Sequence, residues 1–287
     1  MGCTLFPFAF SLFPLACPVI AIATASQKGG VGKTTLCVNL AYCLAKRGWS
    51  VLLVDTDPQG GVGLSLSRSS RTKHGFYDFL CATKSYASSV LRTRLPGLSL
   101  MPVGQFDACS QRGWTAASVP GRLQELLREA ELDGIDCLIF DTAAGLNGMT
   151  ESVLKASDYA IVPQQAEPLA VRSVPHLLET LARYRAEGAR VTVAGLLMTL
   201  VMEDAAVSRQ VVEELRGMLP ASLLFPEDIP RRPIFLEASA HGVPVALCTR
   251  VPTPEAELFD RLAAEVEERT GLRLLRDAPH HHASLLD

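Results

Sequence analysis

One stretch near the start of the chain limits the possible folds more than any other: QKGGVGKTT, at residues 27–35. The apolar, β-prone run from Val19 to Thr24 precedes it and predicts a buried strand. An apolar-rich segment at helical spacing, Leu36 to Arg47, follows it. Glycines between a strand and a helix let successive backbone N–H groups converge on an anion, and the helix adds its positive N-terminal end. The pattern therefore predicts a phosphate-binding loop.

Two side chains of this loop have separate expected roles. Lys33 is placed for the β- and γ-phosphates of a nucleotide, and the Thr34 hydroxyl is placed for Mg²⁺. The residues expected to surround the phosphates are the whole glycine-rich segment: Gly29, Gly30, Val31, Gly32, Lys33, Thr34 and Thr35.

The loop departs from the common pattern G-x-x-x-x-G-K-[ST] at its first position, where Gln27 replaces glycine and Lys28 follows. With this second lysine the chain resembles the deviant Walker A P-loop ATPases, the superfamily of ParA-type partition ATPases, MinD-type ATPases and nitrogenase iron protein. The resemblance implies that the chain binds ATP and Mg²⁺ and that Lys28 reaches across a dimer interface to the partner's ATP. The alternative, a solvated loop lysine, leaves the long match over residues 28–35 unexplained.

A second apolar run, Val51 to Val54, leads into DTDPQG at residues 55–60. Ligands of α/β folds bind at the carboxyl ends of the strands, so acids at this place suit a site beside the phosphate loop. The stretch resembles the D-x-D-P-Q-G element of ParA-type proteins. That resemblance implies that Asp57 positions the attacking water and that Asp55 supports the Mg²⁺ shell. A simple turn with a capping aspartate would explain one acid but not the whole string.

A third apolar run, Cys137 to Phe140, ends in Asp141, which is the Walker B pattern. At this place after a phosphate loop, we expect Asp141 to hold Mg²⁺ through water. ParA-type proteins usually continue with two prolines, whereas this chain has AAG at residues 143–145. That stretch is closer to the MinD and flagellar-number ATPases, so the subfamily and its cargo stay open.

The segment IPRRPIFLEASAHGVP, at residues 229–244, resembles a further ParA-type string. In that family the residues near the Ile-Pro step line the adenine pocket. The resemblance therefore implies adenine contacts from Ile229, Pro230 and Thr199.

The remaining apolar patterns complete an alternation of strands and helices. We expect strands at Leu98–Met101, Tyr159–Val162 and Val191–Leu197, and helices at Gly75–Leu80, Gly121–Leu132, Ala170–Glu187, Ala205–Leu219 and Glu255–Thr270. Such alternation predicts an α/β fold, a mostly parallel sheet with helices on both faces, here as a P-loop NTPase of the deviant Walker A type.

The resemblance covers residues 18–272, which we expect to form a single P-loop ATPase domain. Residues 1–17 are apolar, but they contain no Lys or Arg and are interrupted by Pro7 and Pro14. A signal peptide needs a basic start and a membrane helix needs about 20 uninterrupted apolar residues. We therefore expect a loosely ordered N-terminal extension there, and a polar C-terminal tail at residues 273–287.

Composition limits how the chain could bind nucleic acid. Lys and Arg number 27 against 30 Asp and Glu, a net charge of −3, so a DNA contact must come from a local patch. The candidate DNA-binding residues are four arginines, and solvated arginines without a partner are the alternative: Arg172, Arg231, Arg232 and Arg250. The eight cysteines form no C-x-x-C pair, which disfavours zinc, iron–sulfur clusters and a reductase like nitrogenase iron protein.

Two functions compete on these patterns. The first is a cytoplasmic, nucleoid-associated ATPase for DNA partition or cargo positioning, which forms a homodimer with ATP, binds DNA nonspecifically and is activated by a ParB-like or other partner protein. The second is a MinD- or flagellar-number-type ATPase at the membrane surface, which needs a basic amphipathic C-terminal helix. The segment at residues 271–279 is short and stopped by proline, which argues against a membrane role.

Overall fold

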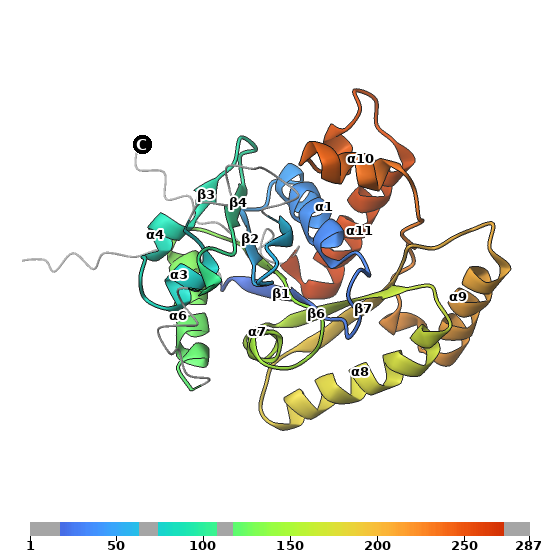
Figure 1. Ribbon diagram of the computed structural model, residues 1–287, viewed down its shortest axis with the longest axis horizontal. Coiled ribbons are helices and arrows are strands. Elements are labelled where there is room, and N and C mark those ends of the chain that lie inside the picture. Colours follow the sequence, from blue (N-terminus) through green and yellow to red (C-terminus); the bar gives the residue numbers. More distant parts are fainter. Residues whose placement is uncertain (1–17, 63–73, 108–116, 273–287) are drawn as a thin grey trace, which may run out of the picture.

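The chain folds around one seven-stranded sheet, drawn in Figure 1. The structure is a computed structural model and describes residues 18–62, 74–107 and 117–272. The strands lie in the order β3-β4-β2-β5-β1-β6-β7, and every neighbouring pair is parallel except β3 and β4. The prediction of an α/β fold with a mostly parallel sheet is confirmed. The predicted N-terminal extension and C-terminal tail lie outside the described residues.

Six of the strands lie where the sequence patterns predict, although β6 and β7 extend three and two residues beyond their predicted ends. The strand bounds are β1 (Ile20–Thr24), β2 (Val51–Asp55), β3 (Leu91–Arg92), β4 (Leu98–Met101), β5 (Cys137–Asp141), β6 (Tyr159–Gln165) and β7 (Thr192–Thr199). Strand β3 was not predicted, because a two-residue strand has no alternation to detect. It pairs antiparallel with β4 and closes one edge of the sheet.

The longer helices also follow the predicted apolar periodicity. Their bounds are α1 (Lys33–Lys46), α3 (Phe76–Leu80), α4 (Tyr86–Ser89), α6 (Val119–Leu132), α7 (Met149–Ala156), α8 (Leu169–Ala186), α9 (Ala206–Met218), α10 (Ile234–His241) and α11 (Pro254–Thr270), with 3₁₀ turns η2 (Ala221–Leu223) and η3 (Val245–Leu247). Helices α4, α7 and α10 were not predicted; each spans eight residues or fewer and gives too few turns for a periodic pattern, although the five-residue α3 was predicted.

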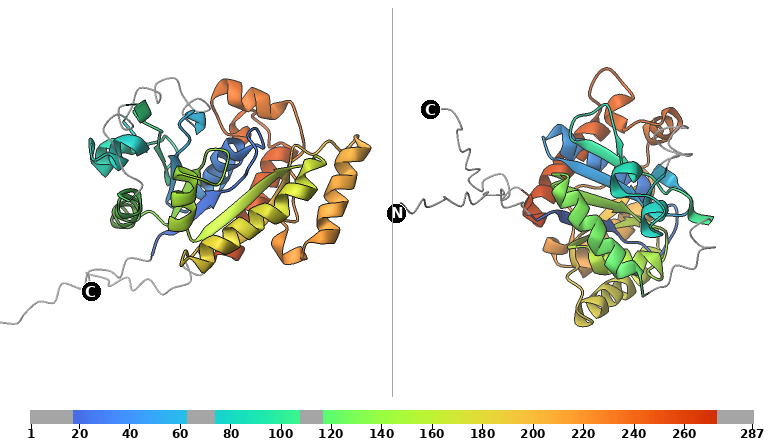
Figure 2. Two further views of the ribbon diagram at one scale, coloured as in Figure 1. Left: turned by 60° about the horizontal axis from the view of Figure 1, so that its bottom comes forward. Right: turned by 90° about the vertical axis from the view of Figure 1, so that its left-hand side faces the viewer.

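The sheet separates two apolar cores. Helices α1 and α11 pack together on one face, while α3, α6, α7, α8 and α9 contribute to the core on the other face (Figures 1 and 2). Strand β2 shows the division within one element: Val51 and Leu53 belong to the first core, and Leu52 and Val54 to the second. A strand that is buried on both faces reads as a continuous apolar run, which is why the central strands were predictable.

The register of the central strands brings two acids together. Asp55 ends β2 and lies beside Asp141, which ends β5. Strand β1, which leads into the glycine-rich loop, is the other neighbour of β5. The segments predicted to bind phosphate and Mg²⁺ therefore meet at the carboxyl edge of three adjacent strands. Among the described residues, no helix is long and apolar enough to span a bilayer.

Candidate nucleotide site

The glycine-rich loop turns sharply between β1 and α1. Gly30 and Gly32 have φ angles of 74° and 88°, which side-chain-bearing residues rarely adopt. Gly32 caps α1, and its carbonyl accepts the first helical hydrogen bond from Leu36 N at 2.8 Å. Lys33 begins the helix and is only 8% exposed. The predicted phosphate lysine therefore lies inside the site, at the positive end of a 14-residue helix.

Three hydrogen bonds hold the glycine-rich loop in place, and the sequence patterns did not predict them. The Thr199 hydroxyl donates to the Val31 carbonyl at 2.9 Å from the end of β7. The Lys28 N–H donates to Ser26 Oγ at 3.3 Å, and Gly145 N–H donates to the Ser26 carbonyl at 2.9 Å. Thr199 was assigned to the adenine pocket, but its described hydroxyl bond supports the phosphate loop. Its contact with adenine stays a prediction.

Thr34 and Asp141 meet as the predicted Mg²⁺ site requires. The Thr34 hydroxyl donates to Asp141 Oδ2 at 2.6 Å. Burial raises the pKa of the Asp141 carboxyl to about 6, although the Thr34 hydroxyl and the nearby Lys33 charge act in the opposite direction. The other oxygen, Asp141 Oδ1, is buried and has no hydrogen-bond partner among the residues that the structure describes. A buried carboxylate oxygen without a donor is costly, and a bound cation would remove that cost.

Gly61 packs so closely against Thr34 that a larger residue would not fit there without a shift. A Cβ atom on Gly61 would lie 2.8 Å from Thr34 Oγ1, closer than such atoms approach in proteins. The Thr34 hydroxyl is thus approached by backbone alone on that side. The Thr34 hydroxyl and the unpartnered oxygen of Asp141 are groups that suit a small hard cation, which takes oxygen ligands.

The two acids after β2 differ in what they contact. Asp55 is fully buried, and its two carboxylate oxygens accept from Asp57 N at 3.2 Å and Val62 N at 3.0 Å. Asp57 is half-buried, and its Oδ1 accepts from Gln59 N at 3.0 Å. These contacts make Asp55 a residue that shapes the acidic loop. Its part in the Mg²⁺ shell and that of Asp57 in placing water stay predictions.

Thr56, between the two acids, is a site residue that the motif patterns did not single out. Its backbone N–H and its hydroxyl both donate to the Asp141 carbonyl, at 2.9 and 2.8 Å. Because Thr56 is only 1% exposed, these bonds tie the acidic loop to the end of β5. The sequence feature that could have pointed to Thr56 was its position between two aspartates at the end of a predicted strand.

The second lysine of the loop lies at the surface. The Lys28 ammonium contacts the Glu167 carboxylate of the same chain and lies 3.4 Å from Gln165 Oε1. The side chains of Lys28 and Glu167 are 48% and 36% exposed. Lys28 is therefore paired at the surface, and about half of its side chain is accessible to solvent. The sequence patterns gave no role to Glu167.

Ile229 and Pro230 approach the site along the end of β7. Ile229 N–H donates to the Met198 carbonyl at 2.8 Å, and the Ile229 carbonyl accepts from Val201 N at 3.1 Å. Pro230 pairs with Val201 in an isolated parallel bridge. The structure thus brings the predicted adenine residues next to Thr199, although their role toward adenine is untested.

The four candidate arginines are all exposed and lie on three separate segments. Arg172 is on α8, Arg231 and Arg232 precede α10, and Arg250 follows η3. Arg232 forms ion pairs with Glu203 and Glu255, so part of its charge is already balanced within the chain. DNA binding by these residues stays a prediction.

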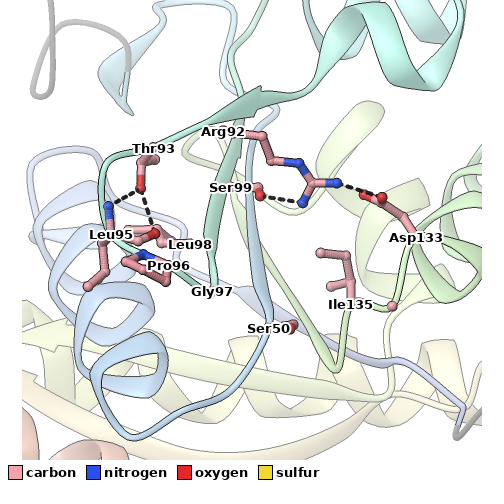
Figure 3. Close-up of a pocket in the computed structure, with 11 residues that line it drawn as sticks. Ser50, Arg92, Thr93, Leu95, Pro96, Gly97, Leu98, Ser99, Asp133 and Ile135 are labelled. Carbon is pink, nitrogen blue, oxygen red and sulfur yellow. Dashed lines mark hydrogen bonds and ion pairs between the residues drawn. The ribbon is translucent and has the colours of Figure 1, made fainter.

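A different pocket lies at the β3–β4 edge of the sheet, and Figure 3 shows its polar side chains. Its volume is about 190 Å³. The Arg92 guanidinium donates to Ser99 Oγ at 3.0 Å and to Asp133 Oδ1 at 2.5 Å. Because these groups satisfy one another, the pocket presents little unpaired charge to a ligand.

Known proteins share both the sequence and the fold of this chain. The family model described as an AAA domain matches residues 19–192. The chromosome-partitioning ATPase Soj of Thermus thermophilus is 36% identical over 259 residues, which are 89% of this chain and 98% of that protein. The chromosome partitioning protein ParA of Caulobacter vibrioides is 31% identical over 257 residues, 88% of this chain and 95% of that protein. A solved structure of cobyrinic acid a,c-diamide synthase from Mycobacterium smegmatis, with bound ATP analogue and magnesium, has a TM-score of 0.67 at 28% identity, covering 86% of this chain and 93% of the other.

Proposed function

This chain belongs to the family of ParA- and Soj-type P-loop ATPases, and from that premise we propose that it uses ATP hydrolysis to partition DNA or to position an intracellular cargo. In this proposal residues 18–272 are one ATPase domain. The ATP-bound form is a homodimer that binds DNA without sequence preference in the cytoplasm, on the nucleoid. A ParB-like or other partner protein triggers hydrolysis.

The contrast between the two loop lysines carries the proposal. Lys33 is 8% exposed and begins α1, where it would bind the phosphates of its own chain's ATP. The Lys28 side chain is 48% exposed, so it can reach the ATP of a second molecule. One buried and one accessible lysine on the same loop suit an ATP-dependent dimer, because Lys33 would bind the phosphates of its own chain's ATP and Lys28 those of the partner's.

The residues at the carboxyl edge divide the chemistry among them. Thr34 and Asp141 would hold Mg²⁺, with the unpartnered Asp141 Oδ1 as the oxygen available to it. When bound, Mg²⁺ supplies positive charge to the β- and γ-phosphates. Asp57 would orient the attacking water, while Asp55 and Thr56 hold the acidic loop in place through their backbone contacts.

Co-sedimentation tests the proposed surface directly. The protein is mixed with DNA, and separately with anionic liposomes, each with ATP or with ADP. We expect pelleting with DNA in ATP but not in ADP, since only the ATP form is proposed to dimerise. Pelleting with liposomes but not with DNA in low salt would overturn the DNA proposal in favour of a membrane-surface ATPase.

A further inference from the structure

A buried tyrosine outside the recognised motifs reaches the loop that carries the two acids. Tyr77 lies on α3 and is 1% exposed. Its hydroxyl donates to the Thr56 carbonyl at 3.0 Å, across 21 residues of sequence. Burial, together with the charges of Asp57 and Asp55, raises the pKa of Tyr77, so the phenol keeps its proton and stays a donor.

That hydrogen bond fixes one side of the peptide unit that leads into Asp57. The Thr56 carbonyl and the Asp57 N–H belong to the same planar unit. Tyr77 binds the carbonyl, and Asp55 Oδ1 accepts from the N–H at 3.2 Å. With both of its polar groups engaged, this peptide plane cannot rotate without breaking a bond. Its orientation sets the direction in which the Asp57 side chain leaves the backbone.

The other polar groups of Thr56 are also engaged. Its N–H and hydroxyl both bind the Asp141 carbonyl, at 2.9 and 2.8 Å. Thr56 therefore lies between the predicted Mg²⁺ acid on one side and Tyr77 on the other. The Tyr77 hydroxyl is the contact that comes from outside the strand ends.

Tyr77 is itself held firmly. Its ring meets those of Phe76 and Phe106 edge to face, with centroids 5.1 and 4.7 Å away. The backbone N–H groups of Phe76 and Tyr77 donate to the carbonyls of Pro102 and Val103, at 2.7 and 3.0 Å. These contacts fix the start of α3 on the segment after β4. The hydroxyl is thus presented from a rigid base, which is what a positioning group requires.

We propose that Tyr77 is a positioning residue for ATP hydrolysis, which acts through the Thr56–Asp57 peptide to hold the Asp57 carboxylate where it orients the attacking water. This inference rests on the proposed ATPase function. Because Tyr77 is not proposed to touch the nucleotide, it affects the hydrolysis step and not the affinity for ATP.

The test compares two variants that each remove one buried phenol hydroxyl. Tyr77→Phe deletes the bond to Thr56, and Tyr86→Phe deletes the 3.0 Å bond from Tyr86 to Asp133 Oδ2 at the far edge of the sheet. The two tyrosines are 1% and 7% exposed, so similar losses of stability are expected. Single-turnover hydrolysis, ATP affinity and melting temperature are measured on the same preparations of the full chain.

Tyr77→Phe is expected to lower the single-turnover rate about tenfold or more, because small misplacements of a water-orienting group are costly. Its ATP affinity should stay within about twofold of wild type, and Tyr86→Phe should hydrolyse ATP at the wild-type rate. In an Asp57→Ala background, Tyr77→Phe should lower the rate no further, since both changes remove the same function.

A measurement without turnover separates positioning from general loosening. In Tyr77→Phe, hydrogen exchange should quicken in the peptide that spans residues 55–60 while the central strands keep the protection seen in Tyr86→Phe. A normal single-turnover rate in folded Tyr77→Phe would overturn this inference alone. Wild-type protein that never hydrolyses ATP would overturn the proposed function as well.

Discussion

The Lys28 ammonium is bound to the Glu167 carboxylate of its own chain, although it is the loop lysine expected to act on a partner's ATP. In the single chain this contact occupies the lysine at the surface. The proposed dimer would therefore exchange the Glu167 contact for the partner's phosphate in each of its two chains.

Breaking this exposed pair opposes dimer formation only modestly. Exposed ion pairs contribute about 0.2–1 kcal/mol each, and two are exchanged per dimer. Glu167→Gln should therefore tighten the ATP-dependent dimer about 2- to 30-fold.

Lys28→Ala should bind ATP, remain monomeric and hydrolyse poorly, whereas Lys46→Ala at the end of α1 should behave as wild type. Analytical ultracentrifugation with ATP measures the dimer fraction of the Glu167→Gln, Lys28→Ala and Lys46→Ala variants. An intact Lys28→Ala dimer would refute a role in trans.

Lys33 is expected to decide nucleotide binding. ATP with Mg²⁺ at about 100 times its Kd should stabilise the wild type by about 2.7 kcal/mol, which raises Tm by about 5–10 °C. Lys33→Ala should show no such rise, because its side chain no longer reaches the phosphates. Chelating Mg²⁺ with EDTA should reduce the wild-type response. A Lys33→Ala protein with the full thermal response would contradict the phosphate assignment.

Gly61 offers a test of the Mg²⁺ site that leaves every proposed ligand in place. In Gly61→Ala the new Cβ would lie 2.8 Å from Thr34 Oγ1, so the hydroxyl must shift. We expect Mg²⁺·ATP affinity to fall about tenfold, which is about 1.4 kcal/mol. Gly121→Ala is the matched control, because its Cβ would meet nothing within 4 Å. Titration calorimetry measures both; equal affinities would mean that Thr34 does not bind the metal.

Asp57 should affect turnover more than binding. Hydrolysis needs an oriented water, while binding needs the phosphate loop and the metal. Asp57→Ala should therefore bind ATP normally, lose turnover and accumulate as a dimer held on DNA. Asp141→Asn should lose Mg²⁺-dependent binding along with turnover. If Asp57 only shapes the turn before Pro58, its variant will instead melt early with or without ATP and hydrolyse in proportion to the folded fraction.

The arginine candidates are tested by salt dependence. Removing one arginine that binds a DNA phosphate should reduce the slope of log K against log salt by about 0.9. Arg231→Ala and Arg250→Ala should show this change in the ATP form, and Arg232→Ala should show less because Glu203 and Glu255 already contact it. Arg128→Ala, exposed on α6 and paired with Glu129, serves as control. Unchanged slopes for Arg231→Ala and Arg250→Ala would remove both from the DNA surface.

Among the strands, those buried on both faces of the sheet were the most predictable. The run from Val51 to Val54 and the run before Asp141 could be read as strands because no polar residue interrupts them. Loop residues 27–35 were predictable because phosphate binding demands their glycines and Lys33. The two-residue strand β3 and the eight-residue helix α10 carry no comparable pattern.

The supporting residues of the site could not be predicted for a different reason. Thr199 and Tyr77 each donate one side-chain hydrogen bond, and Thr56 donates two bonds, to backbone carbonyls far away in sequence. Tyr77 reaches Thr56 only after the sheet is assembled. A backbone carbonyl can accept a hydrogen bond from any donor, so its sequence position does not indicate which residue will be its partner. Such contacts become visible only when the strand order is known.

The strand order also determines when each strand can pair during synthesis on the ribosome. Strand β1 is made first, yet its two neighbours in the sheet are β5 and β6, which begin at Cys137 and Tyr159. When the phosphate loop has just been synthesised, β1 therefore has no neighbouring strand to pair with. It stays unpaired until more than a hundred further residues have been added. We therefore expect an unfinished chain to ignore ATP, and its apolar β1 and β2 segments to be what a chaperone meets during that interval.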